Sequence, residues 1–195
     1  MPRKYVLLIT VTLAVIGLDQ WTKYRVVSDL TTRLDGLSTL SARLHAFYGK
    51  APPEGFDGMH FRTKHFVTVS EKYFRIRYAE NPGAAWGLFR TLPEHIRGPL
   101  FDVVVLGAVL FIVYSVVRLR GRPEERWMMW GLPLVLGGAL GNYIDRLARR
   151  FVVDFLEAHW MDKAAWPSFN IADSAICIGV ALLMLDAFLR REKPA

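Results

Sequence analysis

The chain has 195 residues, of which 52% are hydrophobic and 22% charged, with one cysteine and a formal net charge of +7; its mean hydropathy is +0.21. Soluble domains contain about 45 to 50% apolar residues, so the composition argues against a soluble domain or a disordered chain, and the single cysteine excludes an intrachain disulfide and a zinc site built from cysteines. The apolar excess lies in four blocks, which predicts a membrane protein whose positive charge reports topology, with no nucleic acid bound.

The first apolar block predicts a membrane span over residues 5–24. Arg3 and Lys4 precede it, as basic residues precede the apolar region of a cleavable targeting peptide. No small-residue cleavage site follows, because Leu18 runs directly into Asp19 and a polar stretch. We therefore expect this helix to be retained.

The long connection of residues 28–98 contains a predicted helix. Apolar residues recur over residues 29–48 at spacings of three, four and seven, which is typical of an amphipathic helix. The residues of this stripe are Leu30, Leu34, Leu37, Leu44 and Phe47. The stripe fits two environments, the headgroup region of a membrane or the face of a neighbouring sheet, and both remain open. Residues 50–58 are rich in proline and glycine and predict a loop.

A β-hairpin is predicted next, because residues 65–79 contain apolar side chains that alternate with Arg75 and Arg77 in the period of a half-buried strand. We place its turn near Glu71 and Lys72 and its end at the proline and glycine of residues 82–83.

Three further blocks predict spans over residues 99–117, 127–147 and 169–189. Each approaches the roughly 20 residues that a helix needs to cross a bilayer. The expected fold is therefore mainly α, with four transmembrane helices, a small sheet and an extra amphipathic helix outside the membrane, all in a single domain of residues 1–195.

Basic residues in the short connections predict that both termini are cytoplasmic. These residues are Arg3, Lys4, Arg118, Arg120, Arg122, Arg126, Arg190, Arg191 and Lys193. The connections of residues 28–98 and 148–168 then lie outside. Three cations at the outer end of the third span argue mildly against this orientation: Arg146, Arg149 and Arg150.

Polar residues gather at the predicted outer ends of the spans, where ionisable groups are costly unless they are paired or hydrated. Asn142 and Asp145 are separated by three residues, as are Asn170 and Asp173, so each pair shares one helix face. Gly137 and Gly141 have the spacing that lets two helices approach closely.

Asp154 has two interpretations. It follows a basic turn in a short apolar stretch, Val-Val-Asp-Phe, and is either a surface residue or folds back onto Asp173. In the second case the two carboxylates share one proton, because both cannot ionise easily at close range. One then takes a proton from water while the other protonates a carbonyl or a leaving amine, which is peptide hydrolysis without a metal or another cofactor.

Two other classes of function remain as alternatives. A small ion-coupled transporter needs polar groups through the middle of the bilayer, whereas these spans are apolar in the middle. A structural assembly factor does not need two mutually perturbing aspartates. Zinc-protease and serine-hydrolase motifs are absent from the sequence.

The sequence resembles the lipoprotein signal peptidases, the type II signal peptidases of bacterial inner membranes. The match consists of five motifs in order, at residues 19–23 (Asp-Gln-Trp-Thr-Lys), 81–87 (Asn-Pro-Gly-Ala-Ala-Trp-Gly), 137–146, 152–155 and 169–174. It leaves out about residues 28–64, which are longer than the corresponding link in the family.

The resemblance implies an aspartyl endopeptidase with four membrane helices and an extramembrane β-cradle. Such an enzyme removes the signal peptide of a prolipoprotein just before a diacylglyceryl-modified cysteine. It is a target of globomycin and contacts membrane lipids. We expect a monomer with its active site at the outer face of the cytoplasmic membrane. Asp154 and Asp173 match the catalytic pair. The residues implied for substrate binding are Asn81, Gly83, Asn142, Arg146 and Asn170, and those implied as supports are Asp19, Lys23, Asp145 and Ala172. No metal is implied.

Overall fold

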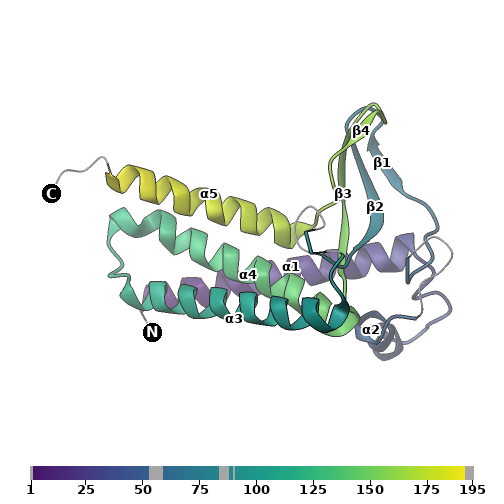
Figure 1. The fold of residues 1–195 in the computed structure, drawn as a ribbon, viewed down its shortest axis with the longest axis horizontal. Helices are drawn as coiled ribbons and strands as arrows, with labels where there is room; N and C mark the ends of the chain where they lie inside the picture. The colour runs from purple at the N-terminus through teal and green to yellow at the C-terminus, as the bar shows by residue number, and fades with distance from the viewer. Residues whose placement is uncertain (1, 53–58, 84–87, 90, 192–195) are drawn as a thin grey trace. The chain divides into compact units, whose positions relative to one another are not determined.

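A computed structural model describes residues 2–52, 59–83, 88–89 and 91–191. The long helices are α1 (Arg3–Leu30), α3 (Glu94–Arg118), α4 (Arg126–Arg149) and α5 (Ile171–Arg191), and the shorter elements are α2 (Leu40–Tyr48), η2 (Pro123–Glu125), β1 (Val67–Ser70), β2 (Phe74–Asn81), β3 (Val152–Trp160) and β4 (Ala164–Ala165) (Figure 1). Residues 53–58 of the predicted loop and residues 84–87 of the second motif lie outside the described residues.

The chain forms two compact units. The helical unit consists of Met1–Asp19, Pro99–Asn142 and Ile171–Ala195, and the sheet unit consists of Gln20–Gly98 and Tyr143–Asn170. The prediction of a single domain over residues 1–195 stays a prediction.

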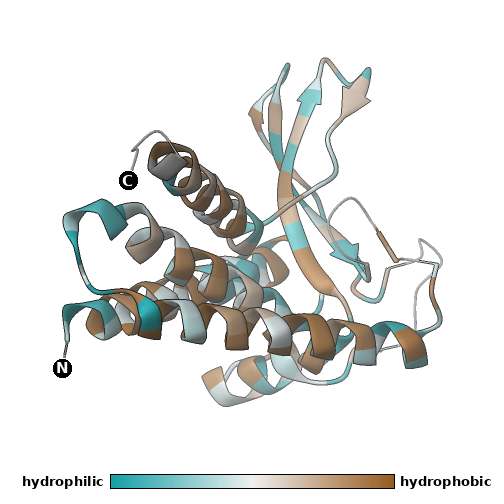
Figure 2. Ribbon diagram, turned by 60° about the vertical axis from the view of Figure 1, so that its left-hand side comes forward, coloured by the Kyte–Doolittle hydropathy of each residue, from teal (hydrophilic) through white to brown (hydrophobic). Residues whose placement is uncertain are grey.

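Long apolar helices build the helical unit, in which α3, α4 and α5 run alongside one another (Figure 1). Its core contains Ile112 and Val116 of α3 and Leu132 and Leu136 of α4, and Leu183 of α5 packs against this core. Large apolar side chains also remain exposed on α3. Figure 2 colours much of the long helices as hydrophobic. Among the described residues, three helices are long and apolar enough to cross a membrane: α1, α3 and residues 171–189 of α5. The fourth predicted span, in α4, is 24 residues long and stays a prediction.

Glycines on α4 bring this helix close to its neighbours. A Cβ atom on Gly137 would lie 2.7 Å from Cβ of Val15, and one on Gly141 would lie 2.7 Å from Oδ2 of Asp19, both on α1. Gly138, on a neighbouring face of α4, lies against the backbone of Ala172 on α5. The prediction that Gly137 and Gly141 permit close helix packing is therefore confirmed.

Replacing Gly138 by alanine is expected to destabilise the helical unit, because the added methyl group would overlap the carbonyl oxygen of Ala172. Overpacking of this kind costs about 1 to 3 kcal/mol. Gly107 of α3 is the matched control, since a Cβ atom there meets nothing within 4 Å, and alanine there gains up to about 1 kcal/mol of helix propensity. Thermal unfolding in detergent measures both variants, and equal midpoints for the two would contradict the packing.

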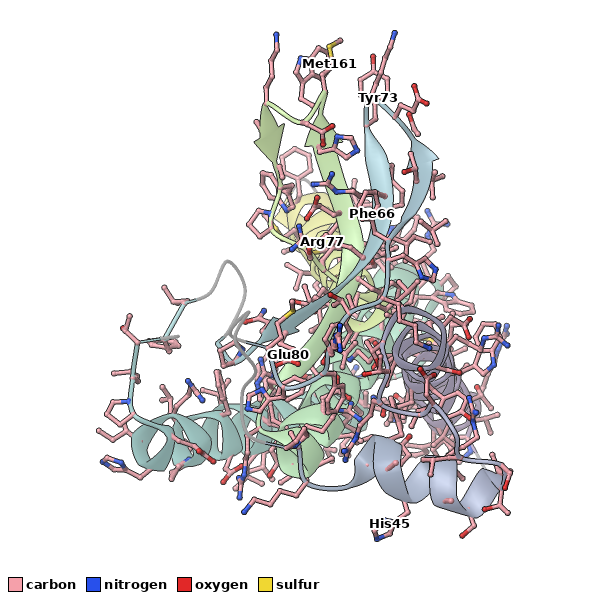
Figure 3. All side chains as sticks on the ribbon, turned by 90° about the vertical axis from the view of Figure 1, so that its right-hand side faces the viewer. His45, Phe66, Tyr73, Arg77, Glu80 and Met161 are labelled. Atoms are coloured by element: carbon pink, nitrogen blue, oxygen red, sulfur yellow. The ribbon has the colours of Figure 1, made fainter. Side chains whose placement is uncertain are left out.

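The sheet unit contains four antiparallel strands in the order β1-β2-β3-β4. The predicted hairpin is confirmed: β1 and β2 are joined through residues 71–73, so the turn includes Glu71 and Lys72. Strand β2 pairs with β3 in a register that sets Ala79 opposite Asp154 and Asn81 opposite Val152. Figure 3 shows Tyr73 and Met161 at one end of this sheet and Glu80 towards the other.

The predicted helix over residues 29–48 is wrong as a continuous element. Helix α1 continues to Leu30, and α2 begins only at Leu40, after Thr39 caps its N-terminus by accepting a hydrogen bond from the Ala42 amide. Leu30, Leu34 and Phe47 of the apolar stripe are buried, whereas Leu44 is exposed. The intervening glycine, Gly36, has a φ of 74° and sits in the turn that separates the two helices.

Candidate active site

Asp154 lies near the start of β3 in the sheet unit and is 2% exposed. Each of its carboxylate oxygens accepts a hydrogen bond from a different asparagine amide. Nδ2 of Asn170 donates to Oδ1 at 2.7 Å, and Nδ2 of Asn81 donates to Oδ2 at 3.1 Å. A buried carboxylate is costly unless such donors replace water, so these two amides fix the orientation of a charged or reactive group. The interpretation of Asp154 as a surface residue is wrong.

Asn81 also organises the loop that follows β2. Its side-chain oxygen accepts a hydrogen bond from the Gly83 amide at 3.0 Å, which is a turn that asparagine favours. The Gly83 carbonyl accepts a hydrogen bond from Nη2 of Arg146 at 2.8 Å. The structure thus brings together four predicted site residues around Asp154: Asn81, Gly83, Arg146 and Asn170.

Asp145 is the centre of a second buried group in the sheet unit. Its Oδ2 lies 3.0 Å from Nζ of Lys23 and accepts a hydrogen bond from the Val153 amide at 3.0 Å. Its Oδ1 accepts hydrogen bonds from Nε2 of Gln20 and from Nη2 of Arg149. The carboxylate therefore ties the end of α1, the end of α4 and the residue before Asp154 together.

Asp173 lies in the first turn of α5 in the helical unit, where a helix N-terminus stabilises negative charge. Nδ2 of Asn142 donates to its Oδ1 at 2.8 Å. In the same unit, Oδ1 of the fully buried Asp19 accepts a hydrogen bond from the Ala172 amide at 3.1 Å. Asp19 thereby satisfies one of the backbone amides that the start of α5 leaves without a helical acceptor.

The predicted site residues therefore fall into two sets, one in each unit. Asn142, Asp173, Asp19 and Ala172 belong to the helical unit, and the groups around Asp154 and Asp145 belong to the sheet unit. The asparagine of each Asn/Asp pair donates to a carboxylate outside its own pair: Asn142 to Asp173, and Asn170 to Asp154. Asp173 and Asp154 therefore each have an amide donor that fixes the orientation of the carboxylate, as a hydrolytic site requires.

Glu80, the residue before Asn81, accepts several hydrogen bonds that the sequence does not reveal. They come from the amides of His60 and Phe61, the Nδ1 atom of His60 and the hydroxyl of Tyr78. Burial, and then the neighbouring Glu80 carboxylate, raises the pKa of Tyr78 well above its usual value. Glu80 thereby fastens residues 60–61 to strand β2.

This raised pKa predicts how stability depends on alkaline pH. The neutral Tyr78 hydroxyl is favoured in the folded state, so its contribution is fully present below the unfolded pKa of about 10 and is lost as the pH rises beyond it. Tyr78→Phe should cost about 1 kcal/mol at neutral pH through the lost hydrogen bond. Above pH 10, thermal midpoints of the wild type should fall more steeply than those of Tyr78→Phe.

The control for this comparison is Tyr73→Phe, because Tyr73 is half exposed at the end of the sheet (Figure 3). It should follow the wild type at every pH. Parallel curves for the wild type and Tyr78→Phe would contradict the role assigned to the buried hydroxyl.

Arg149 is the site residue that the sequence reasoning missed. In the sequence it stands out only as a cation at the outer end of the third span, yet it is 2% exposed and donates a hydrogen bond to Asp145. Its spacing of four from Asp145 on a helix was the available signal.

Comparisons with known proteins identify relatives of this chain. The family model described as signal peptidase (SPase) II matches residues 11–189. A lipoprotein signal peptidase of Anaeromyxobacter sp. (strain Fw109-5) is 44% identical over 188 residues, covering 93% of this chain and 84% of the relative. A lipoprotein signal peptidase of Shewanella loihica is 43% identical over 123 residues, covering 63% of this chain and 69% of the relative.

A solved structure supports the same relationship. It is described as a bacterial membrane enzyme, is 25% identical in sequence and superposes with a TM-score of 0.64, covering 96% of this chain and 93% of that one. The fold, mainly helical with a small antiparallel sheet, is thus that of a known membrane enzyme.

Proposed function

This chain belongs to the signal peptidase II family, and on that premise we propose that it is an aspartyl endopeptidase that removes the signal peptide of prolipoproteins just before a diacylglyceryl-modified cysteine. The substrate class follows from the relatives, which are lipoprotein signal peptidases. The aspartyl mechanism and the position of the cleaved bond rest on the chemistry of the two carboxylates.

The observation that carries the proposal is the pair of amide hydrogen bonds on Asp154. Asn170 and Asn81 each hold one carboxylate oxygen of a side chain that is almost completely buried. Asp173 is held similarly by Asn142. Carboxylates fixed in this way keep one orientation through a reaction, which is what a general acid or base requires.

The covalent chain supports pairing of the two carboxylates in the working enzyme. Asn170, which is hydrogen-bonded to Asp154, precedes Asp173 by three residues. Three consecutive trans peptide units span at most about 11 Å between Cα atoms. We therefore propose that Asp154 and Asp173 form the catalytic dyad, with Asn81, Gly83, Asn142, Arg146 and Asn170 lining the substrate site.

In the proposed reaction, one carboxylate accepts a proton from a water molecule while the water oxygen attacks the scissile carbonyl carbon. The other carboxylate, initially protonated, donates its proton to the carbonyl oxygen, and a tetrahedral gem-diol forms. The carboxylate that took the proton from water then donates it to the leaving nitrogen, while the other carboxylate takes a proton from one gem-diol hydroxyl. The C–N bond breaks, the new carboxyl group and amine form, and the pair again holds one proton. The rate should fall on both the acid and the alkaline side, and the profile belongs to the pair.

The membrane arrangement that we propose has α4 as a fourth span and both termini in the cytoplasm. The outer face would then contain residues 28–98 and 148–168, and with them the active site, and the chain would act as a monomer. Arg149 and Arg146, which argued mildly against this orientation, have acceptors on Asp145 and Gly83.

Cysteine labelling tests this orientation. In a Cys177→Ala background, Lys72→Cys on the hairpin turn should react with an impermeant thiol reagent on intact spheroplasts, whereas Glu124→Cys between α3 and α4 should react only after lysis. Both positions are exposed, so access and not burial decides the result. Labelling of position 124 but not of position 72 would reverse the orientation.

The function itself is tested by incubating the purified protein with a prolipoprotein peptide in two forms, one with a diacylglyceryl-modified cysteine and one unmodified. We expect cleavage of the modified form and little of the other. Cleavage should persist in EDTA. Ion flux through proteoliposomes without any cleavage would instead favour the transporter alternative.

A further inference from the structure

Residues 31–52 and 59–63, which we call the excursion, are the described part of a segment whose two ends meet beside the C-terminal end of α1. Thr31 and Thr63 form an isolated antiparallel bridge. The Thr32 amide donates to the Arg62 carbonyl at 2.9 Å, and the Lys64 amide donates to the Leu30 carbonyl at 2.8 Å. Its described residues, 31–52 and 59–63, contain α2 and include none of the residues proposed for the chemistry, so their contacts are the available guide to their role.

The last turn of α2 contacts Arg149. Nη1 of Arg149 donates to the Phe47 carbonyl at 2.7 Å, and its guanidinium carbon lies 4.4 Å from the centre of the Phe47 ring and 5.9 Å from that of Tyr48. Phe47 is completely buried. A carbonyl in the last turn of a helix has no helical donor and carries the negative end of the helix dipole, so α2 provides Arg149 with both an acceptor and two aromatic faces.

Arg149 connects α2 to the strand of Asp154 by direct contacts. Its Nη2 donates to Oδ1 of Asp145, whose Oδ2 accepts the hydrogen bond of the Val153 amide at 3.0 Å. Val153 immediately precedes Asp154 in β3. The path from the Phe47 carbonyl to the backbone of Asp154 therefore passes through one guanidinium and one carboxylate.

Arg149 is the second cation beside Asp145. Lys23 already lies 3.0 Å from the same carboxylate, and the side chains of all three residues are completely buried. Burying a further cation is costly unless further acceptors surround it. The Phe47 carbonyl and the two rings supply that compensation. Arg149 also orients the Asp145 side chain, because its planar guanidinium group donates to Oδ1 in a fixed direction.

The same excursion contacts the other strand beside Asp154. Its C-terminal end, at His60 and Phe61, donates backbone hydrogen bonds to Glu80, at 2.9 and 3.0 Å to the same oxygen. Glu80 adjoins Asn81, which donates to Asp154. The excursion thus contacts β2 directly through Glu80 and reaches β3 through Arg149 and Asp145.

We propose that the excursion, residues 31–52 and 59–63, supports the proposed active site and that Arg149 is the positioning residue through which α2 orients Asp145, the Val153 amide and hence Asp154. This inference rests on the proposed function for its kinetic consequence, but its structural part stands on the contacts alone. Arg149 acts through Asp145 and touches no reacting atom.

The test compares Arg149→Met, Arg149→Lys and Phe47→Leu with the wild type. Arg149→Met should lower kcat on the lipidated peptide by about tenfold to a hundredfold, since small displacements of a catalytic group have effects of this size, while KM changes by less than about twofold. Arg149→Lys should recover part of the loss, because it keeps the charge but cannot bond two acceptors in the same plane. Phe47→Leu keeps the carbonyl and an apolar side chain and should give a smaller fall in kcat.

The control is Arg150→Met. Arg150 adjoins Arg149 but is exposed and pairs with the exposed Glu94, so its loss should leave kcat unchanged. A purely structural role for Arg149 predicts lower thermal midpoints with normal kcat in the folded fraction. That result in both Arg149→Met and Phe47→Leu would overturn the proposal.

Amide hydrogen exchange provides a readout that needs no activity. The Val153 amide should exchange faster in Arg149→Met and in Phe47→Leu than in the wild type or Arg150→Met, because the acceptor on Asp145 is no longer held. If the wild type does not cleave the lipidated peptide, the proposed function is wrong. Amide hydrogen exchange at residues 152–156 then still tests whether Arg149 and Phe47 hold this strand in place. Unchanged exchange in both variants would overturn the proposal.

Discussion

Replacing Asp154 or Asp173 by asparagine is expected to reduce cleavage of a lipidated prolipoprotein peptide by about 10³-fold or more. A positioned acid or base contributes about 10² to 10⁴ to a rate, and each group is needed in both halves of the proposed reaction. Asparagine keeps the size of the side chain, so the amides of Asn142, Asn170 and Asn81 retain a polar neighbour. The loss should therefore appear in kcat, with folded and membrane-inserted protein.

Three variants control this experiment. Asp162→Asn changes an exposed carboxylate in the turn after β3 and should cleave normally. Ser174→Ala and Cys177→Ala remove the hydroxyl and thiol nearest to Asp173 in sequence and should also cleave normally, because the proposed attack uses water. Near-normal turnover by folded Asp154→Asn would show that Asp154 is not part of the catalytic pair.

Replacing Asp145 by asparagine is expected to cost about 3 to 5 kcal/mol of stability, the usual effect of removing one partner of a buried ion pair. Lys23 and Arg149, both completely buried at their side chains, would then lose the carboxylate that each of them contacts. The Val153 amide would also lose a charged acceptor. Thermal or denaturant-induced unfolding in detergent measures the change.

A double-mutant cycle separates this electrostatic effect from general disruption. Lys23→Met and Asp145→Asn each remove the same Lys23–Asp145 ion pair, so the double variant should be less destabilised than the sum of the single variants. The matched exposed pair is Arg25 with Asp29, whose side chains are 59% and 50% exposed, and Asp29→Asn should cost less than about 1 kcal/mol. Additive losses at Lys23 and Asp145 would contradict the buried ion pair.

Sequence reasoning predicted the helices and the hairpin well, because both depend on local patterns. Apolar runs marked all four long helices, and alternation marked the hairpin of β1 and β2. Close packing at Gly137 and Gly141 followed from their spacing. The ends of the helices were predicted less accurately, because α1 continues to Leu30 and does not end at residue 24. Arg25 and Asp29 form an ion pair at i and i+4, and such pairs extend a helix beyond its apolar block.

Strand β3 was not predicted, and the reason is physical. Residues 152–155 are all buried, so the strand begins without the alternation that marks a half-buried strand. Its partner β2 is separated from it by two long helices in the chain. A short, fully buried strand of this kind can be recognised only from the strand with which it pairs in the structure.

The composition of the candidate site was predicted from motifs, but the connections within it were not. Spacing placed Asn142 beside Asp145 and Asn170 beside Asp173 on shared helix faces, whereas each amide reaches a carboxylate on another element. Arg149 illustrates the same limit. A basic residue at a helix end is usually solvated, and only the position of α2 in space turns it into a buried link between Phe47 and Asp145.

The most direct test of the proposed function is mass spectrometry of the products from one lipidated prolipoprotein peptide. We expect two fragments, one of which begins with the diacylglyceryl-modified cysteine carrying a free α-amine, while the other carries a new carboxylate with one oxygen from labelled water. The Asp154→Asn and Asp173→Asn proteins should yield neither fragment. Cleavage at any other bond, or equal cleavage of the peptide without the lipid, would contradict the function proposed for this chain.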